Sequence, residues 1–399
     1  MEIKVLEALE KHNNVLQTIV SRIDRDFLDE CLHWSEGDSP RNIGAKLRFN
    51  RLVRKFHVPD PEVQDRLQQG CWDVFLQTDS RNARFTPAYF DERLCAAWRS
   101  SKDRFNIYIA RMRLLLSKWL DGFNPAWNLS QPGPGDNFVS LAGFNSEYSK
   151  YVNGHWGATK KALQYLRVIC KSTQALRKYL ISVGWQRCKK IGIEWSTITQ
   201  AGKGSNLLFN IGFREKVHGP WEQREDLREN YADRGFPRFS SVPKDNTKRR
   251  PICLSSLGQQ LVESAVAAGL ESCLDKIGNH LGISNVTGVD GQARHRKRLL
   301  QSGWSTIDLK SASDSNIRSL VWLIFPKHVL KYIDAACPSC IVGPRGELVK
   351  LNMVSPMGNR VTFPLMTLIL LAACHAVRNS NADGDHHSQS LPLVYGDDI

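Results

Sequence analysis

The stretch LVYGDDI, residues 393–399, decides the fold class, because an apolar run delivers a glycine and two adjacent carboxylates. The apolar and β-branched residues up to Tyr395 predict a strand. Gly396, followed by Asp397 and Asp398, predicts a tight turn at the end of that strand. A Gly-Asp-Asp triplet alone fits a solvated surface turn equally well. Its meaning therefore depends on the motifs that accompany it.

A second stretch, WSTIDLKSASD at residues 304–314, repeats the same device. Its apolar lead-in predicts a strand over residues 304–309 with Asp308 at its end, and the serine-rich segment turns into a helix from about residue 316. Asp314 alone fits a helix N-cap. Asp308 lies within the apolar strand, where a cap does not explain it.

If the two strands are neighbours, Asp308, Asp397 and Asp398 converge at one edge of a sheet. Such a cluster repels itself unless cations neutralise it. Hard oxygen ligands with room for substrate phosphates suit Mg²⁺, and two such ions are the usual arrangement for in-line phosphoryl displacement. The sequence therefore predicts a two-metal site.

Residues 242–252, VPKDNTKRRPI, supply the positive charge that such a site needs. Pro243 and Pro251 bracket an extended or looped element rather than a helix. A solvated charge run is the alternative interpretation. Beside a carboxylate cluster, the cations would neutralise an incoming triphosphate and the leaving pyrophosphate. They are Lys244, Lys248, Arg249 and Arg250.

Between the two carboxylate strands lies VSPMGNRVTFP, residues 354–364. Gly358 permits a flexible loop, and Asn359 and Thr362 offer hydrogen bonds at the start of the helix that follows. An amide and a hydroxyl at that place suit recognition of a ribose 2′-hydroxyl. An ordinary loop-to-helix junction is the alternative, and the position between the carboxylates favours the ribose site.

The composition favours a polyanionic partner and argues against a membrane protein. The chain has 399 residues and a formal charge of +14, which favours nucleic acid. Its ten cysteines have no regular spacing, which is typical of free thiols, and zinc binding at residues 337–340 is disfavoured without a second pair. The longest apolar stretch, residues 361–377, contains Pro364 and His375 and is shorter than a bilayer span of about 20 residues, so we expect a buried helix.

The order of these motifs resembles the RNA-dependent RNA polymerases of positive-strand RNA viruses, and most of all the replicase β-subunit of the single-stranded RNA bacteriophages, the levivirus group. The supporting pieces are Val242-Pro243-Lys244, Asp308-Leu309-x-x-Ala312-Ser313-Asp314-Ser315, Met357-Gly358-Asn359-x-x-Thr362-Phe363 and Val394-Tyr395-Gly396-Asp397-Asp398-Ile399. The similarity in motifs covers about residues 240–399. Gly133-Pro134-Gly135 also looks like a loop of that family's fingers region.

The resemblance implies an α+β right-hand polymerase fold. Residues 1–230 would form a mostly helical fingers region, residues 231–300 a basic-loop segment leading into the palm, and residues 301–399 the palm. The palm would hold an antiparallel sheet with packed helices. The later palm segments and the thumb would be missing, so we expect a C-terminally incomplete chain that does not polymerise as it stands.

The resemblance also implies roles for single residues. Asp308 and Asp397 would ligate two Mg²⁺ ions, with Asp398 beside them and Mn²⁺ as the alternative metal. The four cations of residues 244–250 would cover the triphosphate, with Arg250 matching the family's arginine best. The residues that would contact the nucleotide ribose are Ser313 or Asp314, together with Asn359, within the motif that also contains Gly358 and Thr362.

Three positions depart from the family pattern. The second carboxylate of the first motif often stands at the position of Ser313, whereas here Asp314 follows one residue later. Met366 replaces a frequent asparagine, and Ser255 stands where phage replicases tend to have an acid. Sugar selection and the contact made by that acid are therefore in question.

The resemblance implies an RNA template and product, nucleoside triphosphates, and the host elongation factors Tu and Ts with a small-subunit ribosomal protein, in the cytoplasm of a bacterial host. A reverse transcriptase shares a Tyr-x-Asp-Asp turn, but Gly396 and the phage-like motifs argue against it. A non-catalytic basic RNA-binding viral protein explains the charge. It does not explain the ordered carboxylate and glycine motifs.

Overall fold

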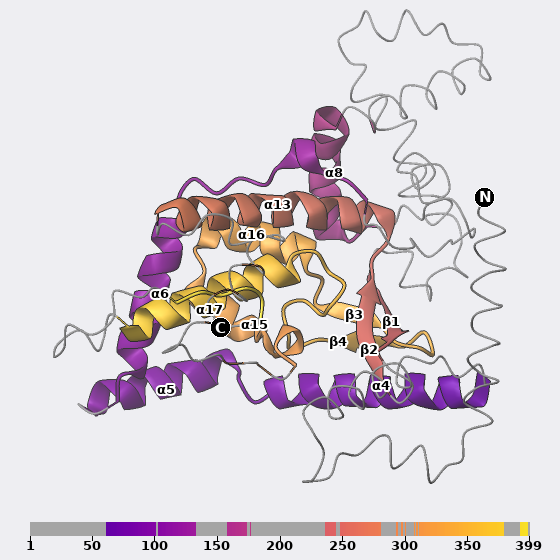
Figure 1. The fold of residues 1–399 in the computed structure, drawn as a ribbon, viewed down its shortest axis with the longest axis horizontal. Helices are drawn as coiled ribbons and strands as arrows, with labels where there is room; N and C mark the ends of the chain where they lie inside the picture. The colour runs from indigo at the N-terminus through magenta and orange to yellow at the C-terminus, as the bar shows by residue number, and fades with distance from the viewer. Residues whose placement is uncertain are drawn as a thin grey trace, which may run out of the picture. The chain divides into compact units, whose positions relative to one another are not determined.

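The computed structural model describes residues 61–100, 103–132, 158–173, 236–244, 248–280, 311–378 and 392–397, together with residues 176, 293, 297, 300, 307 and 309. Within these ranges the chain forms a mixed α+β architecture of eight α-helices and four strands (Figure 1). The helices are α4 (Pro61–Asn82), α5 (Pro87–Arg99), α6 (Phe105–Trp119), α8 (Lys160–Ser172), α13 (Leu257–His280), α15 (Arg318–Ile324), α16 (Lys327–Ala336) and α17 (Thr362–Arg378). Two 3-10 turns are η1 (Trp127–Leu129) and η5 (Ser313–Ser315). The strands are β1 (Arg238–Pro243), β2 (Arg249–Leu254), β3 (Cys340–Val342) and β4 (Leu348–Lys350).

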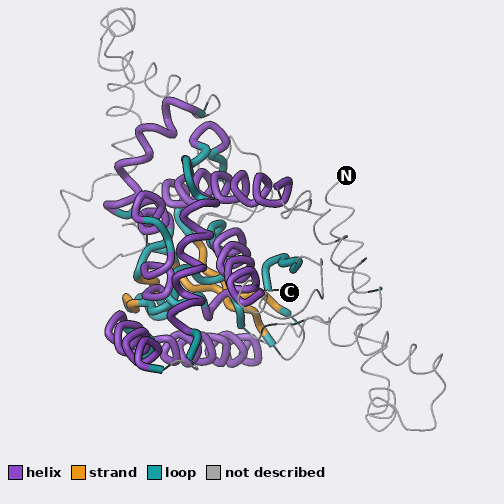
Figure 2. The backbone as a smooth tube through the Cα atoms, turned by 90° about the vertical axis from the view of Figure 1, so that its left-hand side faces the viewer, coloured by secondary structure: helices purple, strands orange, loops and turns teal. Residues whose placement is uncertain are grey.

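The four strands form one small sheet in the order β2-β1-β3-β4. β1 pairs with β3 in parallel, whereas β3 and β4 form an antiparallel hairpin. The antiparallel pairing predicted for the palm, residues 301–399, is present in β3 and β4, whereas β1, which precedes that range, adds a parallel pair. A parallel pair requires a long crossover, and the chain between these strands provides one that contains α13, α15 and α16. Figure 2 shows how little of the described chain is strand beside its helices.

Helix α13 is the central helix, since it packs against α8, α16, α17 and η1 (Figure 1). Its sequence is apolar on several sides, which is typical of a helix buried within a core. Leu261, Val266 and Leu270 are fully buried in the main hydrophobic cluster. Polar residues are buried with them: the Gln259 amide donates to the carbonyls at the end of α16 at 2.9 and 3.2 Å. α13 therefore forms a rigid base for the segments on either side.

The helix starts follow capping rules. The Thr86 hydroxyl accepts from the Tyr89 amide at 3.1 Å at the start of α5, where Pro87 fits the first turn. The Thr159 hydroxyl accepts from the Ala162 amide at 3.3 Å at the start of α8. These local signals are readable from the sequence and fix where the helices begin.

Several predicted elements are confirmed. The apolar stretch 361–377 is the buried helix α17, and the helix expected from about residue 316 is α15. Every described element before residue 230 is helical. None of the helices in the described part of the chain is both long and apolar enough to cross a bilayer.

Neither of the two strands predicted to carry the carboxylates is a strand among the described residues. Residues 392–394 are not a strand, and only Tyr395 forms a single β-bridge. Val394 is buried in the core, and the Tyr395 ring stands edge-on to Phe363 of α17, so this segment packs against a helix. Of residues 304–309 the structure describes only Ile307 and Leu309, and neither lies in a strand.

The chain divides into two compact units, residues 1–71 with 242–250 and residues 72–241 with 251–399. The described part of the first unit is the start of α4, the end of β1 with Lys244, and the start of β2 with Lys248. The Lys244 amide donates to the Lys248 carbonyl at 2.9 Å, and the segment from residue 244 to 250 is called the basic turn below. The Cys71 thiol donates to the Arg249 carbonyl at 3.6 Å. Of the element predicted to be extended or looped between Pro243 and Pro251, Arg249 and Arg250 are extended in β2, and residues 245–247 lie outside the described residues. The predicted domain boundaries stay a prediction.

Candidate functional site

The segment that leads into α17, residues 355–361 and called the glycine loop below, lies against the end of β2. Gly358 has a φ of +103°, and a Cβ there would lie 2.4 Å from the Cys253 carbonyl oxygen. Beside it, the Cys253 amide donates to the Met357 carbonyl at 2.8 Å. Only glycine combines this φ with so close an approach. Gly358 therefore fixes the loop to the strand that follows the basic turn.

The polar side chains of this motif point into the protein. The buried Asn359 donates from Nδ2 to the Ala336 carbonyl at 2.8 Å and accepts at Oδ1 from the Val361 amide at 2.9 Å. The Thr362 Oγ1 lies 2.9 Å from the Pro356 carbonyl. Both side chains shape the loop from within, and their hydrogen-bonding atoms are engaged there.

Asp314, on η5, meets the same loop from the other side. Its carboxylate accepts from the Ser313 hydroxyl at 3.3 Å. Its carbonyl accepts from Asn82 Nδ2 at 2.8 Å. Burial raises the pKa of Asp314 to about 6 and the nearby Asp79 adds to this, against the Ser313 hydrogen bond and the nearby Met357 amide, which favour the charged form. Asp314 is thus a buried carboxylate of unusually low acidity.

The Gly396 turn packs on the first turns of α17. Gly396 has a φ of +64°, and a Cβ there would lie 2.6 Å from the Phe363 ring. Its amide donates to the Thr367 Oγ1 at 3.2 Å, and the Tyr395 ring stands edge-on to Phe363 with centroids 5.0 Å apart. Asp397, the next residue, is exposed. The turn is anchored by its glycine, and it presents a carboxylate.

The structure therefore brings part of the predicted site together. η5 packs against α17, and α17 links the glycine loop to the Gly396 turn. Asp308 and Asp398 lie outside the described residues, so the convergence of three carboxylates stays a prediction. The predicted residues joined in this way are Ser313, Asp314, Gly358, Asn359, Thr362 and Asp397.

The predicted phosphate-binding cations belong to the other unit. Lys244 and Lys248 flank the closed turn and are exposed, as is Arg250, whereas Arg249 is partly buried. Exposed cations on a turn held by backbone hydrogen bonds are available to an anion. Their proximity to the glycine loop stays a prediction.

Glu263 is a buried acid beside the candidate site that the sequence reasoning missed. It lies in the middle of α13 and is 1% exposed. The Ser255 hydroxyl donates to its Oε1 at 2.6 Å. Burial raises its pKa to about 8, against the Ser255 hydrogen bond and the nearby Arg360, which favour the charged form. A lone acid inside the run LVESAVAAGL was the available signal.

Asp79 was also missed. Its carboxylate accepts from the Asn352 amide at 2.9 Å and from the Met353 amide at 2.8 Å, and from Asn352 Nδ2 at 3.0 Å. These bonds hold the segment that leads from β4 into the glycine loop. Nothing local in the sequence of α4 signals a partner more than 270 residues away, so this role needed the tertiary structure.

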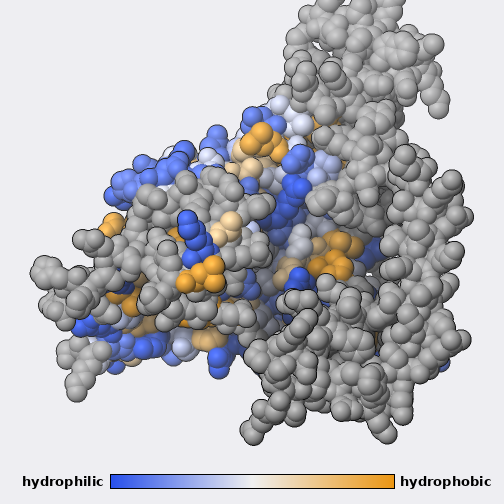
Figure 3. All heavy atoms as spheres, viewed as in Figure 1, coloured by the Kyte–Doolittle hydropathy of each residue, from blue (hydrophilic) through white to orange (hydrophobic). Residues whose placement is uncertain are grey.

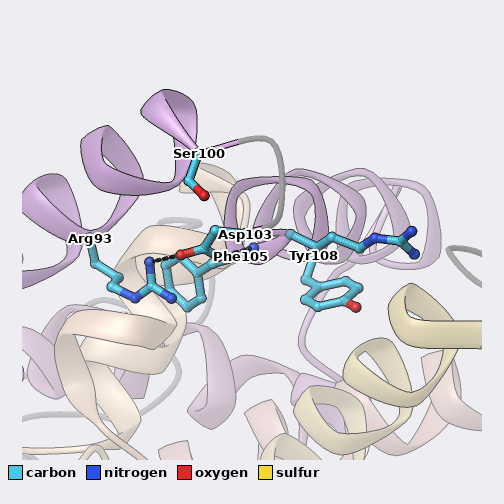
Figure 4. Close-up of a pocket in the computed structure, with 6 residues that line it drawn as sticks. Arg93, Ser100, Asp103, Phe105 and Tyr108 are labelled. Carbon is cyan, nitrogen blue, oxygen red and sulfur yellow. Dashed lines mark hydrogen bonds and ion pairs between the residues drawn. The ribbon is translucent and has the colours of Figure 1, made fainter.

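A hollow of ≈ 560 Å³ lies elsewhere, between α5 and α6 (Figure 4). Arg93 binds Asp103 across it, and Ser100 and Tyr108 are among its other lining residues. None of the predicted site residues lines it. On the face seen in Figure 3, the described surface is largely hydrophilic with small hydrophobic patches.

Asp397 offers carboxylate oxygens, the kind of ligand that a hard divalent cation prefers. Among the described residues, no group of three histidines, cysteines or acidic side chains gathers. Cys337, in the CPSC stretch, is fully buried, and burial raises the pKa of its thiol. It is therefore a poor zinc ligand.

Comparisons with known proteins agree with the motifs. A family model described as RNA replicase, beta-chain, matches residues 45–399. The chain is 30% identical over 191 residues to the RNA-directed RNA polymerase beta chain of Enterobacteria phage GA, which is 46% of this chain and 34% of that protein. It is 29% identical over 192 residues to the beta chain of Enterobacteria phage fr, covering 45% and 32%, and 29% identical over 168 residues to that of Escherichia phage MS2, covering 40% and 27%.

The matched segments thus span about a third of the length of these relatives. The family match itself covers most of this chain, from before α4 to the Gly396 turn, and includes the basic turn, η5 and the glycine loop. The chain belongs to the RNA replicase β-chain family.

Proposed function

We propose that this chain carries the nucleotidyl-transfer site of an RNA-dependent RNA polymerase. The reaction is template-directed transfer of nucleoside monophosphates from nucleoside triphosphates to an RNA 3′-hydroxyl. The observation that carries the proposal is the shared anchoring on α17 of the glycine loop and the turn bearing Asp397, with η5, which contains Asp314, packed against the same helix. Family membership and the names of the phage relatives support it.

The residues proposed to hold the metal are Asp308, Asp397 and Asp398, with two Mg²⁺ ions, or Mn²⁺ as the alternative. Bound there, the ions would activate the attacking 3′-hydroxyl and offset the charge of the leaving pyrophosphate. The exposed turn conformation of Asp397 supports this assignment, because its carboxylate is not committed to the core.

The basic turn is proposed to bind the triphosphate. Lys244, Lys248 and Arg250 are exposed, and charge-assisted hydrogen bonds to phosphate oxygens are among the stronger ones that proteins make. Arg249 adds a fourth cation. The formal charge of +14 suits an RNA template and product bound along the same protein.

The ribose is proposed to be oriented by Ser313 and Asp314 and by the glycine loop. Asn359 and Thr362 act through the shape that they give the loop, since the hydrogen-bonding atoms of both are engaged within the chain. Gly358 keeps the loop against β2. In this proposal the loop is a preformed wall of the nucleotide site.

The biological setting is proposed from the family. The chain would replicate a positive-strand RNA genome in the cytoplasm of a bacterial host. Elongation factors Tu and Ts and a small-subunit ribosomal protein would be its partners. None of the described residues identifies these partners, so copurification from infected cells is the appropriate measurement.

The test is Asp397→Asn in the full-length gene product. We expect RNA synthesis to fall by roughly 10³-fold, since an amide cannot replace a charge-bearing metal ligand. RNA binding, measured by filter retention, should change by less than about twofold, because phosphate contacts dominate affinity. Asp121→Asn, an exposed aspartate after α6, is the matched control.

Undiminished synthesis by Asp397→Asn would refute the proposal. Supplying ribonucleotides and deoxyribonucleotides separately on one RNA template addresses the reverse transcriptase alternative. Preferential incorporation of deoxyribonucleotides would favour that alternative.

A further inference from the structure

The second half of α4 carries buried polar side chains on the same stripe as its buried aromatic ones. Trp72 and Phe75 are buried, and their rings pack against the Phe239 ring of β1 with centroids 4.6 and 5.6 Å apart. Asp79 and Asn82 follow at the spacing of one helix face, and they are only 4% and 6% exposed. Because the aromatic rings fix the helix to β1, the two polar side chains that follow are held in a defined place.

The Asp79 carboxylate binds the backbone between β4 and the glycine loop. Its Oδ1 accepts from the Asn352 amide at 2.9 Å and from the Met353 amide at 2.8 Å. Its Oδ2 accepts from the Asn352 amide at 3.0 Å and from Asn352 Nδ2 at 3.0 Å. Hydrogen bonds from amides to a carboxylate are stronger than those between neutral groups. Both oxygens are engaged within the chain, so Asp79 holds this segment and is not a metal ligand.

Asn82, one helical turn later, binds another segment of the site. Its Nδ2 donates to the Asp314 carbonyl of η5 at 2.8 Å. Just beyond α4, the Phe85 carbonyl accepts from the Ser319 hydroxyl near the start of α15. The end of α4 therefore holds η5 and the helix that follows it. The bond from Asn82 uses the backbone of Asp314 and leaves its carboxylate outside this contact.

The two segments that α4 holds also pair with each other. The Arg318 amide donates to the Asn352 carbonyl at 2.9 Å, and the Val354 amide donates to the Asn316 carbonyl at 2.8 Å. Between these two bonds the segments form a single antiparallel bridge. A slip of one residue in such a pair would reverse the faces of its side chains. The two polar side chains of α4, which are about 4.5 Å apart along the helix axis, bind one segment each and so oppose a slip.

We propose that Asp79 and Asn82 are positioning residues of the nucleotide site, which hold η5 and the start of the glycine loop in register with each other. This inference rests on the proposed function, in which both segments orient the ribose. Neither side chain touches the nucleotide. A shift of either segment would move Ser313 and Asp314 relative to the glycine loop, so the selection of ribonucleotides over deoxyribonucleotides depends on α4.

The experiment compares Asp79→Asn and Asn82→Ala with the parent protein. Asp79→Asn keeps the size of the side chain but places an amide group among hydrogen-bond donors. Asn82→Ala removes one hydrogen bond and is the milder change, so it tests the arrangement even where Asp79→Asn folds poorly. Asp65→Asn and Gln77→Ala, at exposed positions of the same helix, are the matched controls.

Hydrogen exchange of the 399-residue chain, followed by NMR or mass spectrometry, is a readout that requires no polymerase activity. In Asp79→Asn, exchange of the Asn352 and Met353 amides should accelerate about tenfold, as for loss of hydrogen bonds to a charged acceptor. In Asn82→Ala, exchange of the Ser315 amide in η5 should accelerate about threefold, because one neutral hydrogen bond is lost. Amides within α13 should keep their exchange rates, which distinguishes a local change from a general loss of structure.

Kinetics of the full-length gene product separate positioning from folding. KM for nucleoside triphosphates should rise about tenfold in Asp79→Asn and about threefold in Asn82→Ala, while RNA affinity is unchanged. The preference for ribonucleotides over deoxyribonucleotides should fall by about the same factors. A general loss of stability would lower the amount of active enzyme, and with it kcat, without changing KM or this preference.

Unchanged exchange of these amides in both variants would overturn the inference. Variants of an active enzyme that keep the KM and the ribonucleotide preference of the parent would also overturn it, because α4 would then support the fold alone. Both of these outcomes leave the proposed function intact. A parent protein that incorporates no nucleotide under any condition refutes the proposed function, and the positioning role falls with it.

Discussion

The glycine loop and the Gly396 turn each contain a tightly packed glycine, but they place their polar side chains differently. Each carries a glycine with positive φ pressed against another segment, Cys253 for the loop and Phe363 for the turn. The loop's polar side chains are buried and bonded within the chain, whereas the turn presents Asp397 at the surface. The loop therefore has the features of a preformed wall, whereas the turn exposes a side chain that can react or bind a metal.

The difference follows from what each segment contacts. The loop is bonded to β2, to α13 through Arg360 and Ser264, and to the end of α16, so several hydrogen bonds fix its conformation. The turn is held in the described structure by Thr367 and by the rings of Tyr395 and Phe363 on α17. We therefore expect mutations in the loop to affect stability and mutations in the turn to affect chemistry.

The largest expected effect on stability is that of Gly358→Ala. The methyl group would lie 2.4 Å from a backbone oxygen, which cannot move aside as a side chain can, at a φ of +103° that L-residues rarely adopt. We expect the free energy of unfolding to fall by about 3 to 5 kcal/mol. Urea denaturation measures it.

The control for this substitution is Gly70→Ala. Gly70 lies within α4, and a Cβ there would meet nothing within 4 Å. Alanine is the better helix former, so a gain of about 0.5 to 1 kcal/mol is expected. A Gly358→Ala protein as stable as the parent would contradict the close packing of the loop on β2.

A smaller effect on stability is expected from the titration of the buried acid Glu263. The pKa of Glu263 is raised from 4.5 to about 8 by burial, so the folded state retains a proton that the unfolded state releases over this interval. Stability should therefore decrease as pH rises from about 4.5 to about 8, by up to about 1.4 kcal/mol per pH unit. The groups that interact with Glu263 are Ser255, Arg360, Cys253 and Cys337.

Glu263→Gln should remove this part of the pH dependence. Between pH 5.5 and pH 7.5, the stability difference between parent and variant should shift by about 2 to 3 kcal/mol in favour of the variant. Glu263→Leu lacks the same titration and should lose the same slope, whatever its own stability. Parallel curves for parent and variants would show that the acid is ionised throughout.

The sequence was informative where the signal is local. Two prolines identified the extended basic turn, and the apolar run 361–377 identified α17. It was less informative where the partner is distant. The parallel pairing of β1 with β3 depends on a long crossover whose described part contains α13, α15 and α16, and residues 392–394 form no strand. Local sequence propensity predicts neither the parallel pairing nor the absence of a strand at residues 392–394.

In the candidate site, too, local motifs were found from the sequence and contacts between distant residues were not. Asp314, Gly358, Asn359 and Thr362 were found from their order along the chain, and the structure joins them through α17. Glu263 was not found, because an acid in an apolar helix has no meaning until its donors are known. The role of Asn359 and Thr362 is likewise visible only from their bonds, which point into the loop.

The smallest expected effect on stability is that of Gly396→Ala, and it completes the comparison. Its Cβ would lie 2.6 Å from the edge of the Phe363 ring, a side chain that can rotate, and a φ of +64° lies in the left-handed region that costs alanine about 1 to 2 kcal/mol. We expect a loss of stability of that size in urea denaturation, below that of Gly358→Ala. Displacement of the ring would also move the neighbouring Asp397, so RNA synthesis by the full-length gene product should fall by roughly 10²-fold, far more than this loss of stability explains. A variant with reduced stability and unaltered synthesis would mean that the turn tolerates displacement, and Asp397 would then not be a group whose position determines the chemistry.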